Sequence, residues 1–223
     1  MSMHLSRAID ILKKKVLSLA TLVEENVDHA VQSVEKLDQI LAEEVINKDD
    51  VIDQLEIDVE EECLKILALH QPVAVDLRFI VSVLKLNSDL ERIGDLAVKI
   101  AERTLFLAKC DNNCQISFDF QKMYECACLM LKKSLDSLIR CDVNLAYQVA
   151  VSDDTLDEMN RDMYTKVKNG ILNSPEYVDN FLHFIAISRS LERIGDHATN
   201  IAEDVIYMAQ AKIIRHSNDK IFL

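Results

Sequence analysis

The chain repeats one hexapeptide, so its fold has to accommodate the same local structure twice. Leu-Glu-Arg-Ile-Gly-Asp occupies residues 90–95 and again residues 191–196. The match extends beyond the hexapeptide, because Asp49 and Asp153 lie 104 residues apart and begin similar acidic stretches. In each half a proline stands between that stretch and the hexapeptide. Several motifs that recur in the same order indicate an internal duplication.

The chain is also poor in the residues that make turns. Its 223 residues include only three Gly and two Pro, which argues against the many hairpins of an all-β fold. Apolar residues recur at steps of three and four, as in residues 9–45, and this spacing predicts amphipathic helices. We therefore expect an all-α fold of two pseudo-symmetric antiparallel three-helix bundles, residues 1–110 and 111–223.

The helix boundaries are predicted from capping residues. The polar residues 47–50 and 152–154 favour helix N-caps, so the second and fifth helices should begin there. Gly170 is a candidate end for the fifth helix. Proline suits the first turn of a helix, so the third and sixth helices should begin at Pro72 and Pro175. The expected helices are residues 9–45, 49–70, 72–108, 118–150, 152–170 and one from 175, followed by a fraying tail at 216–223.

Composition excludes several classes of function. The net charge of -13 disfavours a nucleic-acid partner, since phosphate binding rests on basic patches. No stretch has the 18 or so uncharged apolar residues of a membrane span, and the first 16 residues carry charges where a signal peptide is apolar. We expect a cytoplasmic protein with no direct membrane insertion and reduced thiols. Cys110-x3-Cys114 is the one suggestive cysteine pair, and bystander thiols are favoured over zinc there.

Each half carries two pairs of carboxylates at helical spacing. Residues four apart lie on one helix face, so each pair places like charges one turn apart, at a cost to an isolated helix. A Gly inside the hexapeptide adds a further cost, which points to close backbone approach. Oxygen ligands of this kind suit Mg, Mn, Ca or Fe, and several carboxylates together can bridge more than one ion. The candidate metal ligands are Asp49, Asp53, Glu91 and Asp95 in the first half and Asp153, Asp157, Glu192 and Asp196 in the second.

On the residues alone, a structural interpretation of these carboxylates is favoured over a metal site. Asp49 and Asp153 stand where N-caps are expected, and acidic residues in a first helical turn are favoured by the helix dipole. Arg92 and Arg193 are spaced to form surface ion pairs with the Asp three residues later. A duplication copies caps as faithfully as it copies ligands.

Further polar residues follow the hexapeptide. Glu102, Asn200 and Glu203 are additional candidate ligands, although a solvated helix face is the favoured interpretation of the two Glu. Lys99 stands at the position that Asn200 takes in the second half, so it should weaken metal binding or act as an internal counter-charge. His197 beside Asp196 is a weaker candidate. No Glu-x-x-His pair, nucleophile elbow, phosphate-binding loop or HExxH motif is present, so catalysis has no candidate residue.

Together these residues resemble the PhoU family, regulators of the phosphate-specific ABC transport system. The resemblance rests on the doubled hexapeptide, the earlier Asp-x3-Asp pairs, Gln71-Pro72 with Asp76-Leu77-Arg78, and Asn200-Ile201-Ala202-Glu203. It spans residues 9–209 and implies multinuclear metal clusters, of iron or zinc in some members, on the carboxylates named above.

The resemblance also implies partners and a role. It implies a cytoplasmic dimer, not an enzyme, that links the ATPase subunit of the phosphate ABC transporter to a phosphate-sensing histidine kinase and represses the phosphate-starvation response. Two alternatives from other classes stay open: a carboxylate-bridged di-metal oxidase and a metal-free helical adaptor. Fold and motifs alone do not name the partner.

Overall fold

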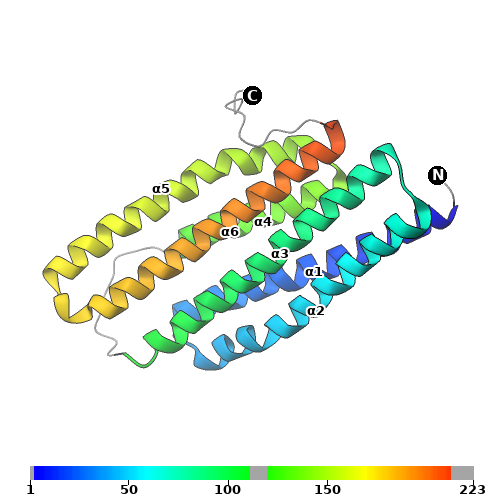
Figure 1. Ribbon diagram of the computed structural model, residues 1–223. Helices are drawn as coiled ribbons and strands as arrows, with labels where there is room; N and C mark the ends of the chain where they lie inside the picture. Colours follow the sequence, from blue (N-terminus) through cyan, green and yellow to red (C-terminus); the bar gives the residue numbers. More distant parts are fainter. Residues whose placement is uncertain (1–2, 111–119, 212–223) are drawn as a thin grey trace.

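The computed structural model describes residues 3–110 and 120–211. These residues form six α-helices and no strand, which confirms the all-α prediction (Figure 1). Residues 114, 118 and 216–223, for which a thiol pair, a helix start and a tail are predicted, lie outside this range. The helices are α1 (Met3–Lys36), α2 (Gln39–His70), α3 (Ala74–Leu107), α4 (Phe120–Arg140), α5 (Val143–Asn173) and α6 (Val178–Gln210), with a 3-10 turn, η1, at Pro175–Tyr177.

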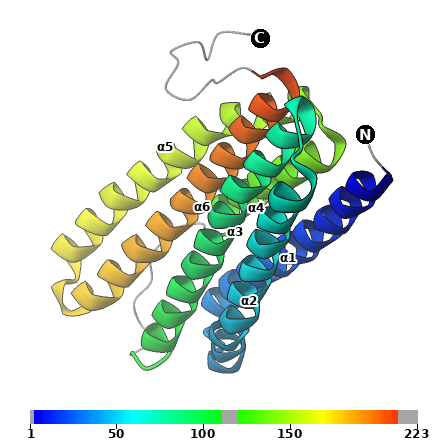
Figure 2. The ribbon, with the colours of Figure 1, turned by 45° about the vertical axis from the view of Figure 1, so that its right-hand side comes forward.

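The helices pack as two groups of three that meet along α3 and α6. Helices α1, α2 and α3 contact one another, as do α4, α5 and α6, while α3 lies along α6 and α1 reaches α4. Figures 1 and 2 show α2 and α5 at opposite edges of the molecule, with α3 and α6 between them. Helices α3 and α6 run antiparallel, because Arg78 at the start of α3 bonds to Met208 at the end of α6. One continuous apolar core includes buried residues from all six helices, and the division at residue 110 stays a prediction.

The connection between the first and second helices falls earlier in the chain than predicted. Helix α1 ends at Lys36, and Asp38 caps α2 by accepting hydrogen bonds from the backbone N–H groups of Ile40 and Leu41, at 3.0 and 3.1 Å. Leu37 takes the left-handed conformation, φ 50°, that usually needs Gly. The predicted helix of residues 9–45 is therefore wrong, because the apolar spacing continues through a turn that contains neither Gly nor Pro.

The second half contains the same turn. Cys141 is left-handed at φ 51°, and Asp142 caps α5 through the N–H groups of Asn144 and Leu145. The predicted helix of residues 118–150 is wrong for the same reason. Asp49 and Asp153 consequently lie inside α2 and α5, several turns after the caps. Their interpretation as N-caps is wrong.

The helix boundaries predicted from Pro72, Pro175 and Gly170 differ from those in the structure. Pro72 lies in the link before α3, after Gln71 has ended α2 in the left-handed conformation, φ 44°. Pro175 opens the 3-10 turn that leads into α6. Helix α5 continues past Gly170 to Asn173, so the predicted end is wrong. Gly170 is small for another reason: a Cβ there would lie 2.6 Å from the ring of Phe181.

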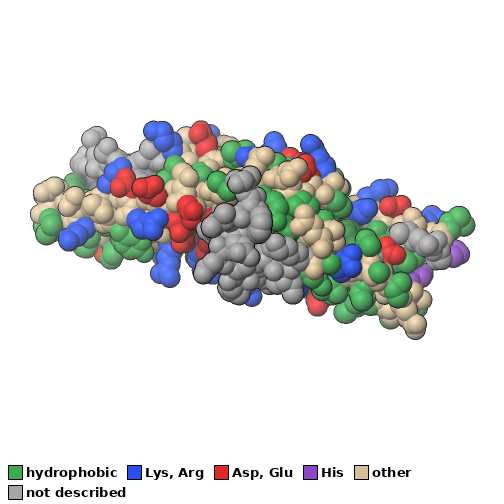
Figure 3. Space-filling view, turned by 90° about the horizontal axis from the view of Figure 1, so that it is seen from above, with side chains coloured by type: hydrophobic (Ala, Val, Ile, Leu, Met, Phe, Trp, Pro, Cys, Tyr) green, Lys and Arg blue, Asp and Glu red, His purple; other side chains and the backbone are tan. Residues whose placement is uncertain are grey.

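The surface mixes charged and apolar groups. Figure 3 shows acidic and basic side chains side by side on one face, with hydrophobic side chains exposed between them. Among the described residues, no helix has the length and apolarity that a bilayer crossing requires.

Candidate metal centre

The two hexapeptide glycines let neighbouring helices approach closely. A Cβ on Gly94 of α3 would lie 3.2 Å from Cγ2 of Ile52 on α2. A Cβ on Gly195 of α6 would overlap the side chain of Leu156 on α5. Ile52 and Leu156 directly precede Asp53 and Asp157, so each close approach occurs at the level of the candidate ligands. Each glycine makes room for a side chain of the neighbouring helix, and the predicted close approach of two backbones stays a prediction.

In the second half this approach brings three carboxylates together. Asp157 of α5 and Glu192 and Asp196 of α6 each place one oxygen within 4.8 Å of the other two. The first two are half-buried and Asp196 is exposed, so the group opens to solvent at one side. Asp153, one turn earlier on α5, accepts a hydrogen bond of 3.3 Å from the hydroxyl of Thr199 on α6. All four predicted residues of this half therefore line the contact between α5 and α6.

The charges of this second cluster are poorly balanced. Burial raises the pKa of Glu192, and the neighbouring carboxylates of Asp196 and Asp157 raise it further, against a smaller opposing effect of Arg189. Burial and then Asp157 raise the pKa of Asp196, while His197 and Arg193 lower it. Part of each rise in pKa, after the effect of burial, comes from repulsion between the ionised carboxylates. A bound cation would relieve this repulsion.

In the first half the four predicted ligands lie within electrostatic reach of one another. Burial, followed by the charges of Asp53, Asp95 and Glu91, raises the pKa of Asp49 to about 6 from 3.8. Burial and the neighbouring acids Asp95 and Asp53 likewise raise the pKa of Glu91. The register between α2 and α3, which the sequence left open, thus places the two pairs within electrostatic reach of each other.

This first cluster differs from the second by an internal cation. The ammonium of Lys99 lies 3.6 Å from the carboxylate of Asp95, one turn earlier on α3. Both side chains are about half-exposed, at 48% and 47%. The predicted alternative that Lys99 acts as a counter-charge is the one that the geometry favours.

The additional candidate ligands mostly face elsewhere. The amide of Asn200 donates to Asp89 of α3 at 3.3 Å, and Nδ1 of His197 lies 2.8 Å from the same carboxylate oxygen. Both side chains therefore join α6 to α3 and do not point into the second cluster. Glu102 is exposed and Glu203 half-buried.

One acidic residue beside the first cluster, Glu56, was not predicted from the sequence. Glu56 lies one turn after Asp53 on α2, and burial, followed by the charges of Glu60 and Asp53, raises its pKa. The buried amide of Asn87, one turn before Glu91, donates to the Glu56 carboxylate at 2.8 Å. The spacing Asp49-x3-Asp53-x2-Glu56 was the available signal, because all three positions fall on one helix face.

The chemistry of these residues fits a metal ion. Oxygen-only donor sets suit hard or borderline cations. After burial, a neighbouring carboxylate is the next largest cause of the raised pKa values of Asp49, Glu192 and Asp196, so a cation at either cluster would relieve repulsion. Each cluster also draws its ligands from two helices, so a bound ion would link α2 to α3 or α5 to α6.

Comparisons with known proteins point to one family. The family model described as "PhoU domain" matches residues 16–104 and 120–205, which correspond to α1–α3 and α4–α6. Among curated proteins, the chain is 34% identical to the phosphate-specific transport system accessory protein PhoU homolog 1 of Thermotoga maritima, covering 94% of this chain and 90% of that one. It is 38% identical to the PhoU homolog of Aquifex aeolicus, covering 98% of both chains.

Solved structures agree with this result. The crystal structure of PhoU from Pseudomonas aeruginosa superposes with a TM-score of 0.90 at 36% identity, covering 93% of this chain and 99% of that one. The phosphate transport system regulatory protein PhoU from Streptococcus pneumoniae gives 0.84 at 29% identity, covering 94% and 98%. The two domain matches confirm the predicted duplication.

Proposed function

The chain belongs to the PhoU family, and from that premise we propose that it is a metal-binding accessory regulator of phosphate transport. The observation that carries the metal-binding part is the convergence of Asp157, Glu192 and Asp196 from two helices. The phosphate part is supported by the relatives, which are named as accessory proteins of the phosphate-specific transport system. The role is regulatory and not catalytic.

Each acidic cluster holds one or more cations between its two helices. Asp153, Asp157, Glu192 and Asp196 would hold them in the second half, and Asp49, Asp53, Glu91 and Asp95 in the first. Iron or zinc is proposed from the family resemblance, while the oxygen donors also suit Mn, Mg or Ca. A bound cation supplies charge neutralisation and a link between neighbouring helices. The packing of the two helices keeps their carboxylates close enough for one cation to bind both helices.

The regulator acts through protein partners in the cytoplasm. Its proposed partners are the ATPase subunit of the phosphate ABC transporter and a phosphate-sensing histidine kinase. The proposed oligomeric state is a homodimer. When phosphate is plentiful, the complex represses the phosphate-starvation response. The family membership supports this role, and the cations stabilise the helix pairs that present the docking surface.

Metal content tests the metal-binding part. Protein purified without chelator is expected to contain metal by elemental analysis, and Glu192→Gln with Asp196→Asn should lower both the metal content and the melting temperature. Asp162→Asn is the matched control, because Asp162 is exposed on α5 and pairs with Lys166 at 3.7 Å. Wild-type protein without metal, and without a metal-dependent rise in melting temperature, would leave only a metal-free helical adaptor.

A reporter tests the regulatory part independently. In cells that lack this chain, a promoter of the phosphate-starvation response should stay active in phosphate-rich medium. The wild-type chain should silence it, and the Asp162→Asn variant should do the same. A reporter that ignores the wild-type chain would contradict the regulatory role, whatever the metal content is.

A further inference from the structure

A cavity of about 430 Å³ lies at one end of the molecule, where α1, the start of α3, the end of α4 and the end of α6 meet. Phe79 lies 12 residues before Glu91 on α3, and Met208 lies 12 residues after Asp196 on α6. This separation is about three helical turns, so the cavity is distinct from both acidic clusters. Its apolar walls include Ile9, Val16, Phe79, Val83, Leu138 and Met208.

The size and lining of this cavity are those of a small-molecule site. Ligand pockets have volumes of about 300–1,000 Å³ and combine apolar walls with a few polar groups. Only three of the 14 residues that line the cavity are charged. Leu17, Val75 and Ile139 are 39%, 61% and 53% exposed, so the apolar lining continues to the surface. An apolar ligand can therefore enter from solvent.

The charged groups at the mouth of the cavity favour an anion. Lys13 and Arg78 are basic and Asp76 is acidic, so the mouth has a net charge of +1 in a chain of net charge -13. Within the part of the chain that the structure describes, neither Lys13 nor Arg78 forms an ion pair. Nε of Arg78 donates to the backbone carbonyl of Met208 at 3.5 Å. The ammonium of Lys13 lies 5.5 Å from the centre of the Phe79 ring.

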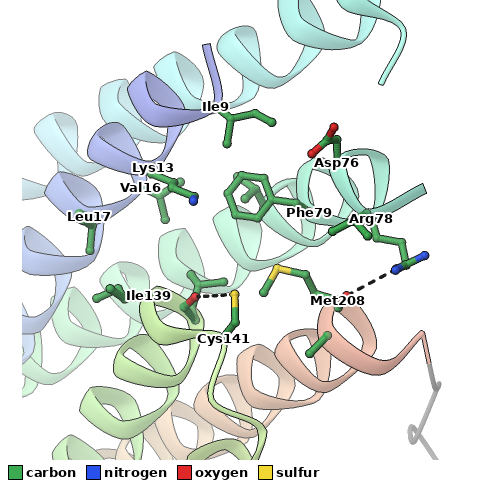
Figure 4. Close-up of a pocket in the computed structure, with 14 residues that line it drawn as sticks. Ile9, Lys13, Val16, Leu17, Asp76, Arg78, Phe79, Ile139, Cys141 and Met208 are labelled. Carbon is green, nitrogen blue, oxygen red and sulfur yellow. Dashed lines mark hydrogen bonds between the residues drawn. The ribbon is translucent and has the colours of Figure 1, made fainter. Parts of the chain in front are cut away.

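The Phe79 ring separates the charges into two groups. Figure 4 shows Lys13 of α1 on one side of the ring and Asp76 and Arg78 of α3 on the other. Lys13 is exposed, so an anionic group beside it keeps its contact with water. The acidic side chain of Asp76 lies on the far side of the ring from that position. Lys13 is therefore the cation that can bind the charged end of an amphiphile whose chain lies in the cavity.

The other half of the molecule does not repeat this chemistry. The hexapeptides begin at Leu90 and Leu191, 101 residues apart, and α3 and α6 run without a break to their first turns. The counterparts of Arg78 and Phe79 are therefore Asp179 and Asn180. An acidic residue and an amide replace the basic residue and the aromatic ring. The apolar cavity with a basic mouth consequently does not follow from the duplication itself.

From these observations we propose that the cavity binds a free fatty acid, with the carboxylate beside the ammonium of Lys13 and the alkyl chain against Phe79, Ile139 and Met208. The walls come from α1 and α3 of the first half and from α4 and α6 of the second. The bound chain therefore contacts both halves, and binding to the folded state stabilises their association. This inference does not rest on metal binding or on the regulation of phosphate transport.

Calorimetric titration of the full chain tests the charged end. Decanoate, used below its critical micelle concentration, should bind at one saturable site per chain. Lys13→Gln should weaken its binding by about two- to fivefold, the range of an exposed ion pair, and should leave the binding of uncharged 1-decanol unchanged. Lys14→Gln is the matched control, because Lys14 is the next residue on α1 and lines a different groove, with Leu55. No saturable binding, or equal losses from both variants, would overturn the proposal.

Chain length and a blocked wall test the apolar part. Each methylene added between octanoate and decanoate should tighten binding by up to about fourfold. Ile139→Glu places a carboxylate in the cavity wall and should abolish decanoate binding, while circular dichroism shows that the helices remain. Leu182→Glu is the matched control, since Leu182 is 54% exposed and lies at the other end, near the start of α6. Binding that survives Ile139→Glu would place the ligand elsewhere and overturn the proposal.

The thiol of Cys141 provides an independent readout. Cys141 is exposed and lines the cavity, whereas Cys110 lies beyond the opposite end of α3. Decanoate should slow the alkylation of Cys141 by iodoacetamide, followed by peptide mass spectrometry, and leave the rate at Cys110 unchanged. Protection of Cys141 that appears without decanoate as the protein concentration rises would mean that a second copy of the chain covers the cavity. That result would overturn the proposal.

Discussion

The two acidic clusters share a design but differ in how their charge is balanced. In the first half Lys99 lies beside Asp95 and supplies an internal cation. In the second half Asn200, the nearest counterpart of Lys99, faces Asp89 of α3 and supplies none. The second cluster also shows three converging carboxylate oxygens. The two halves therefore share their acidic residues, and we expect the second cluster, which lacks the lysine, to depend more on an external cation.

Asn200 and His197 contribute instead to the contact between the two halves. Asp89 receives both His197 and Asn200 of α6, and all three lie in the contact between α3 and α6. Nearby, Lys85 of α3 pairs with the buried Asp204 of α6 at 3.3 Å. Side chains that follow the second hexapeptide thus join two bundles, and this use removes Asn200 and His197 from the second cluster.

The largest expected effect comes from removing ligands one half at a time. Glu192→Gln with Asp196→Asn should remove the more tightly bound metal, and Glu91→Gln with Asp95→Asn the weaker. A ligand at a hundred times its Kd stabilises a protein by about 2.7 kcal/mol, which is worth roughly 5–10 °C in melting temperature for a chain of this size. Metal titrations of both variants followed by calorimetry measure the difference. A greater loss from the first-half variant would reverse the proposed order of the two sites.

The glycines should separate the halves by stability. Gly195→Ala forces a methyl group into the fully buried Leu156, and overpacking of this kind costs about 1–3 kcal/mol. Gly94→Ala meets Ile52 at 3.2 Å, a smaller conflict, while Ala gains about 1 kcal/mol of helix propensity. Chemical denaturation of metal-free protein should show clear destabilisation for Gly195→Ala and little change for Gly94→Ala. Equal losses would show that the two helix contacts are equally tight.

Much of the fold follows from the sequence because helical periodicity and duplication are strong local signals. The number of helices and the pairing of halves required only the spacing of apolar residues and the repeated motifs. The turns at Leu37 and Cys141 were missed because they place ordinary side chains in the left-handed conformation. The capping aspartates Asp38 and Asp142 were the available signals, but residues 47–50 and 152–154 offered similar ones.

The acidic clusters were partly predictable for the same reason. Residues on one helix, such as Glu91 and Asp95, are placed by spacing alone. The register between two helices depends on packing, here of Gly94 against Ile52, and spacing does not specify it. The contact of His197 with Asp89 depends on how α3 meets α6, and residues 108 positions apart give no local signal.

The pH dependence of the metal-free protein should also distinguish the halves. The pKa of Asp49 is about 6 in the folded state and 3.8 ordinarily, so the folded state binds this proton more tightly. The resulting stability is full below about pH 4 and is lost as pH rises through about 6. Wild-type protein in chelator should therefore gain melting temperature, relative to Asp49→Asn, as pH falls through this window.

Asp153→Asn is the matched variant in the second half. Asp153 accepts a hydrogen bond from Thr199, and its replacement should change the pH profile less than Asp49→Asn does. Saturating metal should flatten the wild-type profile, because a cation performs the neutralisation that protonation performs without metal. A wild-type profile that coincides with that of Asp49→Asn in chelator would contradict the role of this carboxyl group.

The smallest expected effect is that of Lys99→Asn, which gives the first half the residue type of the second. The ion pair with Asp95 joins two half-exposed groups and contributes about 0.2–1 kcal/mol, so the stability of metal-free protein should hardly change. Metal affinity of the first cluster should rise severalfold, because Asp95 is released and a nearby positive charge is removed. Lys166→Asn is the matched control, since it breaks the similar pair with Asp162, at 3.7 Å, away from both clusters. If Lys99→Asn lowered the affinity instead, Lys99 would be organising the first cluster, and the two halves would differ in ligand geometry and not in charge.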